Sequence, residues 1–284
     1  MKRILALILV AVLALTAMTS CKMNGSKDSN DLEDIKAAGK IVVGMECAYA
    51  PYNWTTTTQS ETTVPIANNA GAYADGYDVQ IAKLIAEEIG VELVIKAIEW
   101  DGLIPALEAG EIDMIIAGMS PTEERKLSID FSNTYFDSNL VMVVRKDGNY
   151  TGATKIADFS GAKITGQLNT FHYAVIGQIN GVNKQTALAD FAALTQSLAS
   201  GAIDGYVCEK PGAESAVASN EDFTYIEFAD GNGFTCDPAE SSISVGLRKG
   251  STLTASVNAA IAKLTTANKN DMMDAAIERQ PAEN

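Results

Sequence analysis

The sequence lacks most of the features by which enzymes and metalloproteins are recognised. Its 284 residues include four cysteines and one histidine, His172, and no CxxC or Cys/His spacing typical of a metal site. There is no Gly-x-Ser-x-Gly turn, phosphate-binding loop or dinucleotide-binding glycine pattern. His172 belongs to no nucleophile motif, so we interpret it as a surface or capping residue. We therefore expect no metal, no cofactor and no catalytic residue.

Positive charge is also scarce. The chain has 21 Lys and Arg against 36 Asp and Glu, a formal net charge of −15. A protein this acidic does not bind nucleic acid or an anionic lipid surface by charge. Its hydrophobic content of 47% is normal for a globular protein with a sizeable core.

Long apolar runs are limited to the beginning of the chain. Lys2 and Arg3 precede the apolar segment 4–17, which is short for a bilayer span and is typical of a signal peptide. The sequence Met-Thr-Ser-Cys at 18–21 resembles a lipobox, which predicts lipidation of Cys21. The polar segment 22–30 then resembles a flexible tether. An ordinary secretory leader with an incidental cysteine, or an uncleaved transmembrane anchor, would be the alternatives.

The cysteine count limits disulfide formation. If Cys21 carries lipid, the odd number that remains is Cys47, Cys208 and Cys236, so at most one disulfide can form. We expect at least one buried free thiol.

Alternating strand-like and helix-like segments predict an α/β protein with parallel strands. Strands are expected at 40–45, 91–98, 112–117, 162–165, 205–208 and 242–248. Helices are expected at 78–89, with Asp78 as N-cap, at 103–109 and 188–200, after Ser120, after Asn169 or Thr170, and twice within 253–279. Residues 55–75 have no periodicity and are expected to form an inserted loop or hairpin.

The segment 112–125 runs from a buried strand into a helix start. Ser120 and Glu123 fit a capping box, and Pro121 suits the first helical position. Backbone N–H groups and the helix dipole at such a turn favour an anion, and Arg125 could add a bidentate contact to a carboxylate. The alternative is that Glu123 satisfies the helix terminus and Arg125 is a surface residue.

Aromatic and acidic residues also follow predicted strands. Tyr49, Tyr52 and Trp100 stand after the first two strands, where rings could enclose a small ligand, although Tyr52 suits core packing better. Glu46 and Glu209 stand at the ends of buried strands. A carboxylate there needs a cation, a salt bridge or solvent.

Five segments in order resemble the bacterial extracellular solute-binding proteins of family 3, which bind amino acids. They are IVVGMECAYAPY (41–52), GYDVQIA (76–82), WDGLIPAL (100–107), GMSPTEER (118–125) with DFS (130–132), and AIDGY (202–206) with EKP (209–211). Together they cover nearly all of the chain after the leader.

The resemblance implies an α/β, two-lobe periplasmic-binding-protein type II fold with a hinge of two crossover segments. The expected division is a leader at 1–20, a lipidated cysteine and tether at 21–36, one lobe from 37–141 plus 238–284, and a second lobe from 142–237. The expected protein is a monomer outside the cytoplasm, anchored to the membrane through Cys21, which delivers an L-amino acid to an ABC permease.

The resemblance also implies the roles of individual residues. Arg125 and the backbone at Gly118 and Ser120 would hold the ligand's α-carboxylate, with Thr170 completing the site from the second lobe. Asn169 replaces the family's usual Gly before that Thr. Glu209 stands where the family usually has the Asp that receives the α-ammonium. Tyr49 and Trp100 would flank the ligand side chain, and Glu46 would meet its end, which suits a polar or cationic side chain.

Two other functions remain open. A dehydratase-like enzyme on the same fold would need a general acid over the pocket, for which Glu46 and Glu209 are the candidates. A surface adhesin that has lost its ligand would not need Arg125 and Glu209. The leader favours a binding protein over a cytosolic enzyme.

Overall fold

The computed structural model describes residues 31–238 and 240–281. The predicted leader, Cys21 and the segment 22–30 lie outside these residues. Helix α2 (Asp31–Ala38) begins within the segment 21–36 that was expected to be a tether. Its first turn carries three acids, which suit the positive end of the helix dipole, and Ile35 is buried.

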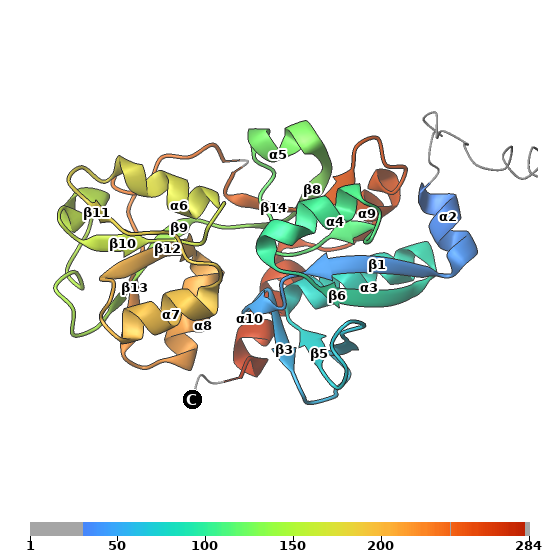
Figure 1. Cartoon of the computed structure of the whole chain (residues 1–284), viewed down its shortest axis with the longest axis horizontal. Helices are drawn as coiled ribbons and strands as arrows, with labels where there is room; N and C mark the ends of the chain where they lie inside the picture. The colour runs from blue at the N-terminus through green and yellow to red at the C-terminus, as the bar shows by residue number, and fades with distance from the viewer. Residues whose placement is uncertain (1–30, 239, 282–284) are drawn as a thin grey trace, which may run out of the picture. The chain divides into compact units, whose positions relative to one another are not determined.

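Two five-stranded sheets form the centre of the fold (Figure 1). The first has the order β6 (Glu92–Ala97), β1 (Lys40–Met45), β7 (Met114–Ile115), β14 (Ser242–Arg248), β8 (Ile129–Asp137). The second has the order β11 (Asn183–Lys184), β10 (Lys163–Thr165), β12 (Gly205–Glu209), β9 (Leu140–Arg145), β13 (Phe223–Ile226).

Each sheet combines parallel and antiparallel strands. In the first, β1 is parallel to β6 and β7, whereas β14 is antiparallel to β7 and β8. In the second, β10 is parallel to β11 and β12, whereas β9 is antiparallel to β12 and β13. The parallel strand pairs expected from the sequence are therefore present, and each sheet also contains antiparallel pairs. The chain crosses between the sheets twice, from β8 to β9 and from β13 to β14.

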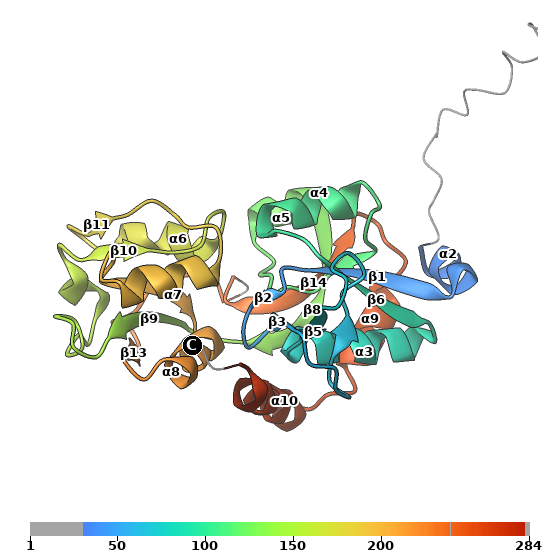
Figure 2. The same ribbon diagram turned by 60° about the horizontal axis from the view of Figure 1, so that its bottom comes forward.

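Helices cover both sheets. Helices α3 and α4 lie on opposite faces of the first sheet around β1, which is clearest in Figure 2. Helices α6, α7 and α8 pack against strands of the second sheet. The helix bounds are α3 (Tyr77–Ile89), α4 (Leu103–Glu108), α5 (Glu123–Ser128), α6 (Phe171–Val175), α7 (Phe191–Ala199), α8 (Lys210–Ser219), α9 (Thr254–Ile261) and α10 (Thr266–Arg279). Single-turn 3-10 helices are η1 (Trp100–Gly102), η2 (Ile156–Phe159) and η3 (Ile176–Gln178).

Two sequence predictions about element ends are wrong. Gly76, not Asp78, is the N-cap of α3, and the Asp78 side chain is wholly buried instead of capping the helix. Within the segment 112–117, which was expected to be one strand, only Met114 and Ile115 pair with a neighbouring strand on both sides. Asp113 and Ile116 on either side still donate backbone N–H groups to carbonyls of β1, and every residue of 112–117 except Asp113 is buried.

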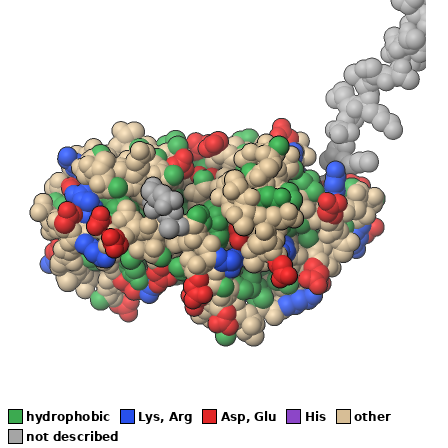
Figure 3. Space-filling model, turned by 90° about the horizontal axis from the view of Figure 1, so that it is seen from below, with side chains coloured by type: hydrophobic (Ala, Val, Ile, Leu, Met, Phe, Trp, Pro, Cys, Tyr) green, Lys and Arg blue, Asp and Glu red, His purple; other side chains and the backbone are tan. Residues whose placement is uncertain are grey.

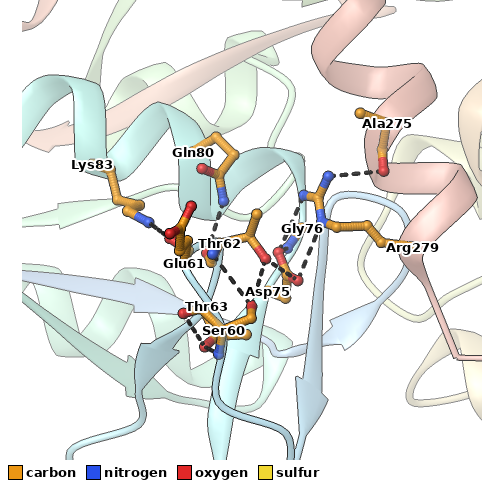
Figure 4. A network of polar contacts seen from close by, with 10 residues as sticks. All are labelled: Ser60, Glu61, Thr62, Thr63, Asp75, Gly76, Gln80, Lys83, Ala275 and Arg279. Atoms are coloured by element: carbon orange, nitrogen blue, oxygen red, sulfur yellow. Dashed lines mark hydrogen bonds and ion pairs between the residues drawn. The ribbon is translucent and has the colours of Figure 1, made fainter.

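The inserted segment predicted at 55–75 contributes the end of β3 (Asn53–Thr56) and all of β4 (Val64–Pro65) and β5 (Tyr73–Asp75) to a small sheet that β2 (Ala48–Tyr49) completes. Figure 4 shows how it is fixed. Gln80 and Lys83 of α3 donate to the carbonyls of Thr62 and Glu61. The carboxylate of Asp75 accepts hydrogen bonds from Thr62 and from the guanidinium of Arg279 at the end of α10.

The surface seen in Figure 3 carries Asp and Glu side chains interspersed with Lys and Arg. Within the described part of the chain, no helix is both long and apolar enough to cross a membrane. Cys47, Cys208 and Cys236 are all free thiols, so the prediction of at least one buried free thiol is confirmed. Burial raises the pKa of the Cys47 thiol to about 12.

Candidate ligand-binding site

The predicted site residues, apart from Glu46, line one small cavity. Its walls are Tyr49, Trp100, Gly118, Ser120, Arg125, Gln167, Thr170, Phe171, His172 and Glu209. Its volume of about 10 Å³ is room for about one water molecule. The side chains around it are therefore packed against each other, and an amino acid would have to move some of them.

Arg125 reaches this cavity from the short helix α5. The predicted capping box at Ser120 is wrong, because the helix begins two residues later. The Thr122 side chain accepts a hydrogen bond from the Arg125 N–H, 3.3 Å away. The Ser120 carbonyl instead accepts from Arg125 Nη1, at 2.9 Å, and so fixes the guanidinium.

The guanidinium of Arg125 donates to neutral acceptors. Besides Ser120 O, Nη2 donates to the carbonyl of Asn169 at 3.1 Å, and Cζ lies 5.0 Å from the centre of the Trp100 ring. Burial lowers the pKa of Arg125 to about 10, so it remains a cation at neutral pH. The alternative that Arg125 is only a surface residue is not supported by these contacts.

A buried polar network lies behind the cavity wall. Asp78 accepts hydrogen bonds from Asn53 Nδ2 at 2.8 Å and from the Tyr135 hydroxyl at 2.7 Å. Asn53 Oδ1 accepts from the Cys47 N–H, and the Tyr135 hydroxyl accepts from the Gly118 N–H. Cys47 and Gly118 both have left-handed backbone angles, with φ of 57° and 60°. The network therefore fixes two turns at the edge of the site.

The Gly118 contact limits one predicted role. The resemblance implied that the backbone at Gly118 holds the ligand carboxylate, but its N–H already donates to Tyr135 at 3.3 Å. A Cβ at this position would also lie 3.1 Å from the Tyr49 ring. Gly118 thus serves here by allowing the close approach of Tyr49.

Glu209, at the end of β12, lines the same cavity and is completely buried. The Tyr49 hydroxyl donates to Glu209 Oε2, and His172 Nε2 lies 2.8 Å from Oε1. Burial raises the pKa of Glu209, but the nearby charge of His172 together with hydrogen bonds to the carboxylate, including that from Tyr49, outweighs this effect, so the net pKa lies below its ordinary value. Glu209 is therefore an anion in a dry environment.

The prediction for His172 is wrong. We expected a surface or capping residue, whereas His172 is 4% exposed and stands in the site. Its ring packs between Phe171, at a centroid distance of 4.5 Å, and Phe191, at 6.4 Å. Its ionic partner is Glu209, far away in the sequence, and no local pattern around His172 indicates that pairing.

Several buried polar atoms of this wall are left without a hydrogen bond. Among the described residues, Glu209 Oε1 and both ring nitrogens of His172 have no partner of hydrogen-bond geometry. The 2.8 Å approach of His172 to Glu209 is thus a charge contact that is poorly aligned as a hydrogen bond. Unsatisfied polar atoms are rare in protein interiors, and a cluster of them around one cavity is typical of a ligand site.

Glu46 lies next to this cavity without lining it. Its Oε1 accepts a hydrogen bond from Gln167 Nε2 at 2.9 Å, and Oε2 has no partner among the described residues. Burial is the main reason why the pKa of Glu46 rises to about 7. Gln167 was not predicted as a site residue, and it joins Glu46 to the cavity wall.

Thr170 caps α6, as predicted, by accepting a hydrogen bond from the Tyr173 N–H. Asn169 before it has a left-handed φ of 56°. Asn is one of the few residues other than Gly that adopts this conformation readily, so the replacement keeps the turn. The Asn169 side chain also donates to Asp101 at 2.9 Å.

The aromatic residues of the site have different surroundings. Tyr49 stacks on Phe191 with centroids 3.9 Å apart, and Tyr52 is wholly buried beside it, as its expected core role requires. A second, larger cavity of about 560 Å³ adjoins the site and shares Trp100, Arg125, Thr170 and Phe171 with it. Four acids also line this larger cavity, namely Asp101, Glu123, Glu124 and Glu240.

Comparison with known proteins places the chain in a family. Residues 41–275 match the family model "Bacterial extracellular solute-binding proteins, family 3". The chain is 27% identical to the arginine-binding extracellular protein ArtP of Bacillus subtilis, over 91% of each sequence.

Solved structures agree. An amino acid ABC transporter substrate-binding protein from Streptococcus pneumoniae bound to L-arginine has a TM-score of 0.76 and 25% identity, covering 88% of this chain and 98% of that one. The ancestral amino-acid-binding protein AncCDT-1, a precursor of cyclohexadienyl dehydratase, has a TM-score of 0.68 and 25% identity, covering 87% and 98%. The expected two-lobe α/β fold is confirmed, and the chain belongs to the bacterial extracellular solute-binding proteins of family 3.

Proposed function

We propose that this protein is the extracytoplasmic binding component of an amino-acid ABC importer and that it closes around an L-amino acid. The observation that carries the proposal is the pairing of two opposite charges on one cavity, the Arg125 guanidinium and the Glu209 carboxylate. An amino acid is a zwitterion whose carboxylate suits the first and whose ammonium suits the second. Glu209 is completely buried and Arg125 is half-buried, so the opposite charges of the ligand offset part of the cost of removing each group from water.

The arrangement links binding to movement. Arg125 belongs to the part of the chain that carries the first sheet, and Glu209 ends a strand of the second. A ligand held by both residues favours the closed form over any form in which they separate. We propose that an ABC permease recognises this closed form, and that lipidated Cys21 keeps the monomeric protein at the membrane.

The ligand side chain is proposed to be polar or cationic. Glu46 has one unpartnered carboxylate oxygen, and its raised pKa of about 7 means that a nearby cation would convert it to the anion. The ring of Trp100 stands on the cavity as well, and aromatic faces attract cations. Tight binding of leucine or glutamate, without affinity for lysine, arginine or glutamine, would contradict this part.

A thermal-unfolding screen with each standard L-amino acid tests the proposal. A ligand that binds only the folded state stabilises it by about 4 kcal/mol at a thousandfold excess over Kd. The shift should be lost in Arg125→Ala and in Glu209→Ala. Lys126→Ala is the matched control, because Lys126 is on the same helix but pairs with the exposed Glu123. No shift from any amino acid with well-folded protein would contradict the proposal.

A dehydratase-like activity is the second candidate. A buried carboxyl with a pKa of about 7 is suited to general acid catalysis at neutral pH. The likeness to AncCDT-1, named as a precursor of a dehydratase, gives this candidate further support. Turnover of a cyclohexadienyl substrate that is lost in Glu46→Gln would favour it; binding of amino acids without turnover would favour the importer component.

A further inference from the structure

The imidazole of His172 occupies the position next to Glu209 that a ligand ammonium would need. Nε2 lies 2.8 Å from Glu209 Oε1, and both side chains are almost wholly buried, with exposures of 5% and 1%. The other oxygen, Oε2, is taken by the Tyr49 hydroxyl. Oε1 is thus the one atom of this carboxylate left for a cation.

We propose that His172 is a built-in competitor of the ligand, a positioning residue that holds Glu209 in place and must give up this contact when an ammonium group binds. This inference rests on the proposed function. A protonated imidazole and an ammonium cannot both lie against one buried carboxylate at low cost, because like charges repel strongly in a dry environment. Binding therefore excludes the protonated form of His172 or displaces its ring.

The geometry explains why the contact can be given up. It is not aligned as a hydrogen bond, and both ring nitrogens lack a hydrogen-bond partner among the described residues. The ring is held mainly by Phe171 and Phe191, which offer no polar alternative. A competitor of this kind holds the carboxylate in place without binding it as tightly as a well-aligned pair would.

The consequence is an affinity that depends on pH. A ligand that excludes the protonated form of an imidazole binds more tightly as the pH rises, because fewer protons then compete with it. One excluded proton changes Kd by at most about tenfold per pH unit. The ligand should also release up to one proton on binding at acidic pH.

The other ionisable groups around His172 come from four elements. Glu209 ends β12, Tyr49 lies on β2 and Arg125 on α5, and all three line the same cavity. Glu46, which follows β1, is linked to the cavity through Gln167. Glu46 could also release a proton when a cationic side chain binds, so its contribution has to be separated from that of His172.

The test measures Kd by calorimetry at pH 5.5, 6.5, 7.5 and 8.5, with the standard L-amino acids as probes. The protein, Glu46→Gln, His172→Gln and the double variant are compared. Wild type should bind at least tenfold more weakly at pH 5.5 than at pH 8.5. His172→Gln should bind more tightly than wild type at pH 5.5 and equally at pH 8.5, and the double variant should show a flat profile.

Proton release provides a second readout, measured in buffers of different ionisation enthalpy. Release at pH 5.5 should fall in His172→Gln and persist in Lys126→Ala, a control at a residue that does not line the cavity. Superimposable pH profiles for wild type and His172→Gln would overturn the inference while leaving the proposed function intact. So would weaker binding by His172→Gln at every pH. If no amino acid binds any of the proteins, the proposed function itself fails, and this inference fails with it.

Discussion

Glu46 is 7% exposed, and the pKa of its carboxyl group rises from 4.5 to about 7 in the folded protein. The folded state therefore holds a proton that the unfolded chain releases between these two values. A raised pKa contributes stability that is fully present below the unfolded pKa and is lost as the pH rises through the folded pKa.

We predict that the ligand-free protein becomes less stable between pH 4.5 and pH 7, by up to about 3 kcal/mol from this residue. Asp78, whose pKa is raised to about 6 by burial, contributes in the same direction. Urea denaturation at pH 5, 6, 7 and 8 measures the trend. Glu46→Gln should flatten most of it, and an unchanged slope in that variant would show that the carboxyl is not buried in solution.

Replacing Asp78 tests whether the buried polar network behind the cavity stabilises the site. Asp78→Ala leaves the Asn53 amide and the Tyr135 hydroxyl without their buried acceptor, at a cost of about 1–3 kcal/mol for each group. Ligand affinity should fall as well, because Cys47 and Gly118 lose the network that fixes their turns. Asp271→Ala, at an exposed position of α10, is the control. Denaturation and ligand titration of the two variants measure both effects.

Single residues show where sequence reasoning ends. Arg125 and Tyr49 come after strands of the first sheet, and Glu209 ends a strand of the second. Strand ends meet at one edge of each sheet, so the grouping within each sheet could be predicted from position, whereas the meeting of the two edges follows from the two-lobe fold that the resemblance implies. His172 and Gln167 could not be found in this way, because each acquires its role from a carboxylate more than thirty positions away, Glu209 or Glu46. Such pairings depend on the tertiary fold.

Among the helices and strands, α5 carries Arg125, and it begins two residues after the start predicted from the sequence. Thr122→Ala removes the side chain that caps the helix and should cost about 1 kcal/mol of stability. Ser120→Ala should cost less, because the carbonyl and not the side chain of Ser120 holds Arg125. Chemical denaturation measures the loss of stability in each variant. A larger loss in Ser120→Ala than in Thr122→Ala would support the capping box predicted from the sequence.

The bounds of the helices and strands also show what the sequence can and cannot predict. Strands β1 and β14 have the predicted bounds of 40–45 and 242–248, because buried apolar residues dominate both. The predicted start of α5 differs from the observed one because Ser120 and Thr122 are both good N-cap residues. Glu123 also suits a capping box with Ser120. Local propensity cannot choose between two adequate caps when a tertiary contact, here that of the Arg125 guanidinium, decides.

At the scale of the whole molecule, the last helix, α10, connects parts of the chain that are far apart in the sequence. Arg279 binds Asp75 of β5 through Nε and Nη2, at 3.3 and 3.2 Å (Figure 4). The next residue, Gln280, donates to the carbonyl of Ser215 in α8 at 2.9 Å. The end of α10 thus contacts the segment that carries the first sheet and a helix that packs on the second.

We predict that Arg279→Ala lowers stability by about 1–3 kcal/mol, because Asp75 is buried and loses a bidentate partner. Lys249→Ala, which removes the exposed ion pair with Asp130, should change stability by less than about 1 kcal/mol. Unfolding curves of the two variants provide the comparison. Equal effects would mean that the Asp75 contact is no stronger than an ordinary surface pair.

The position of Trp100 gives the molecule an optical property. The sequence has two tryptophans: Trp54 is buried in β3, whereas Trp100 is half-buried on the cavity wall with Arg125 against its ring. Indole emission depends on the polarity and charge around the ring, so Trp54→Phe should leave a single emitter at the site. Its spectrum should shift with added ligand and not with a ligand-free buffer change. The protein would then serve as an unlabelled fluorescent sensor of its own ligand.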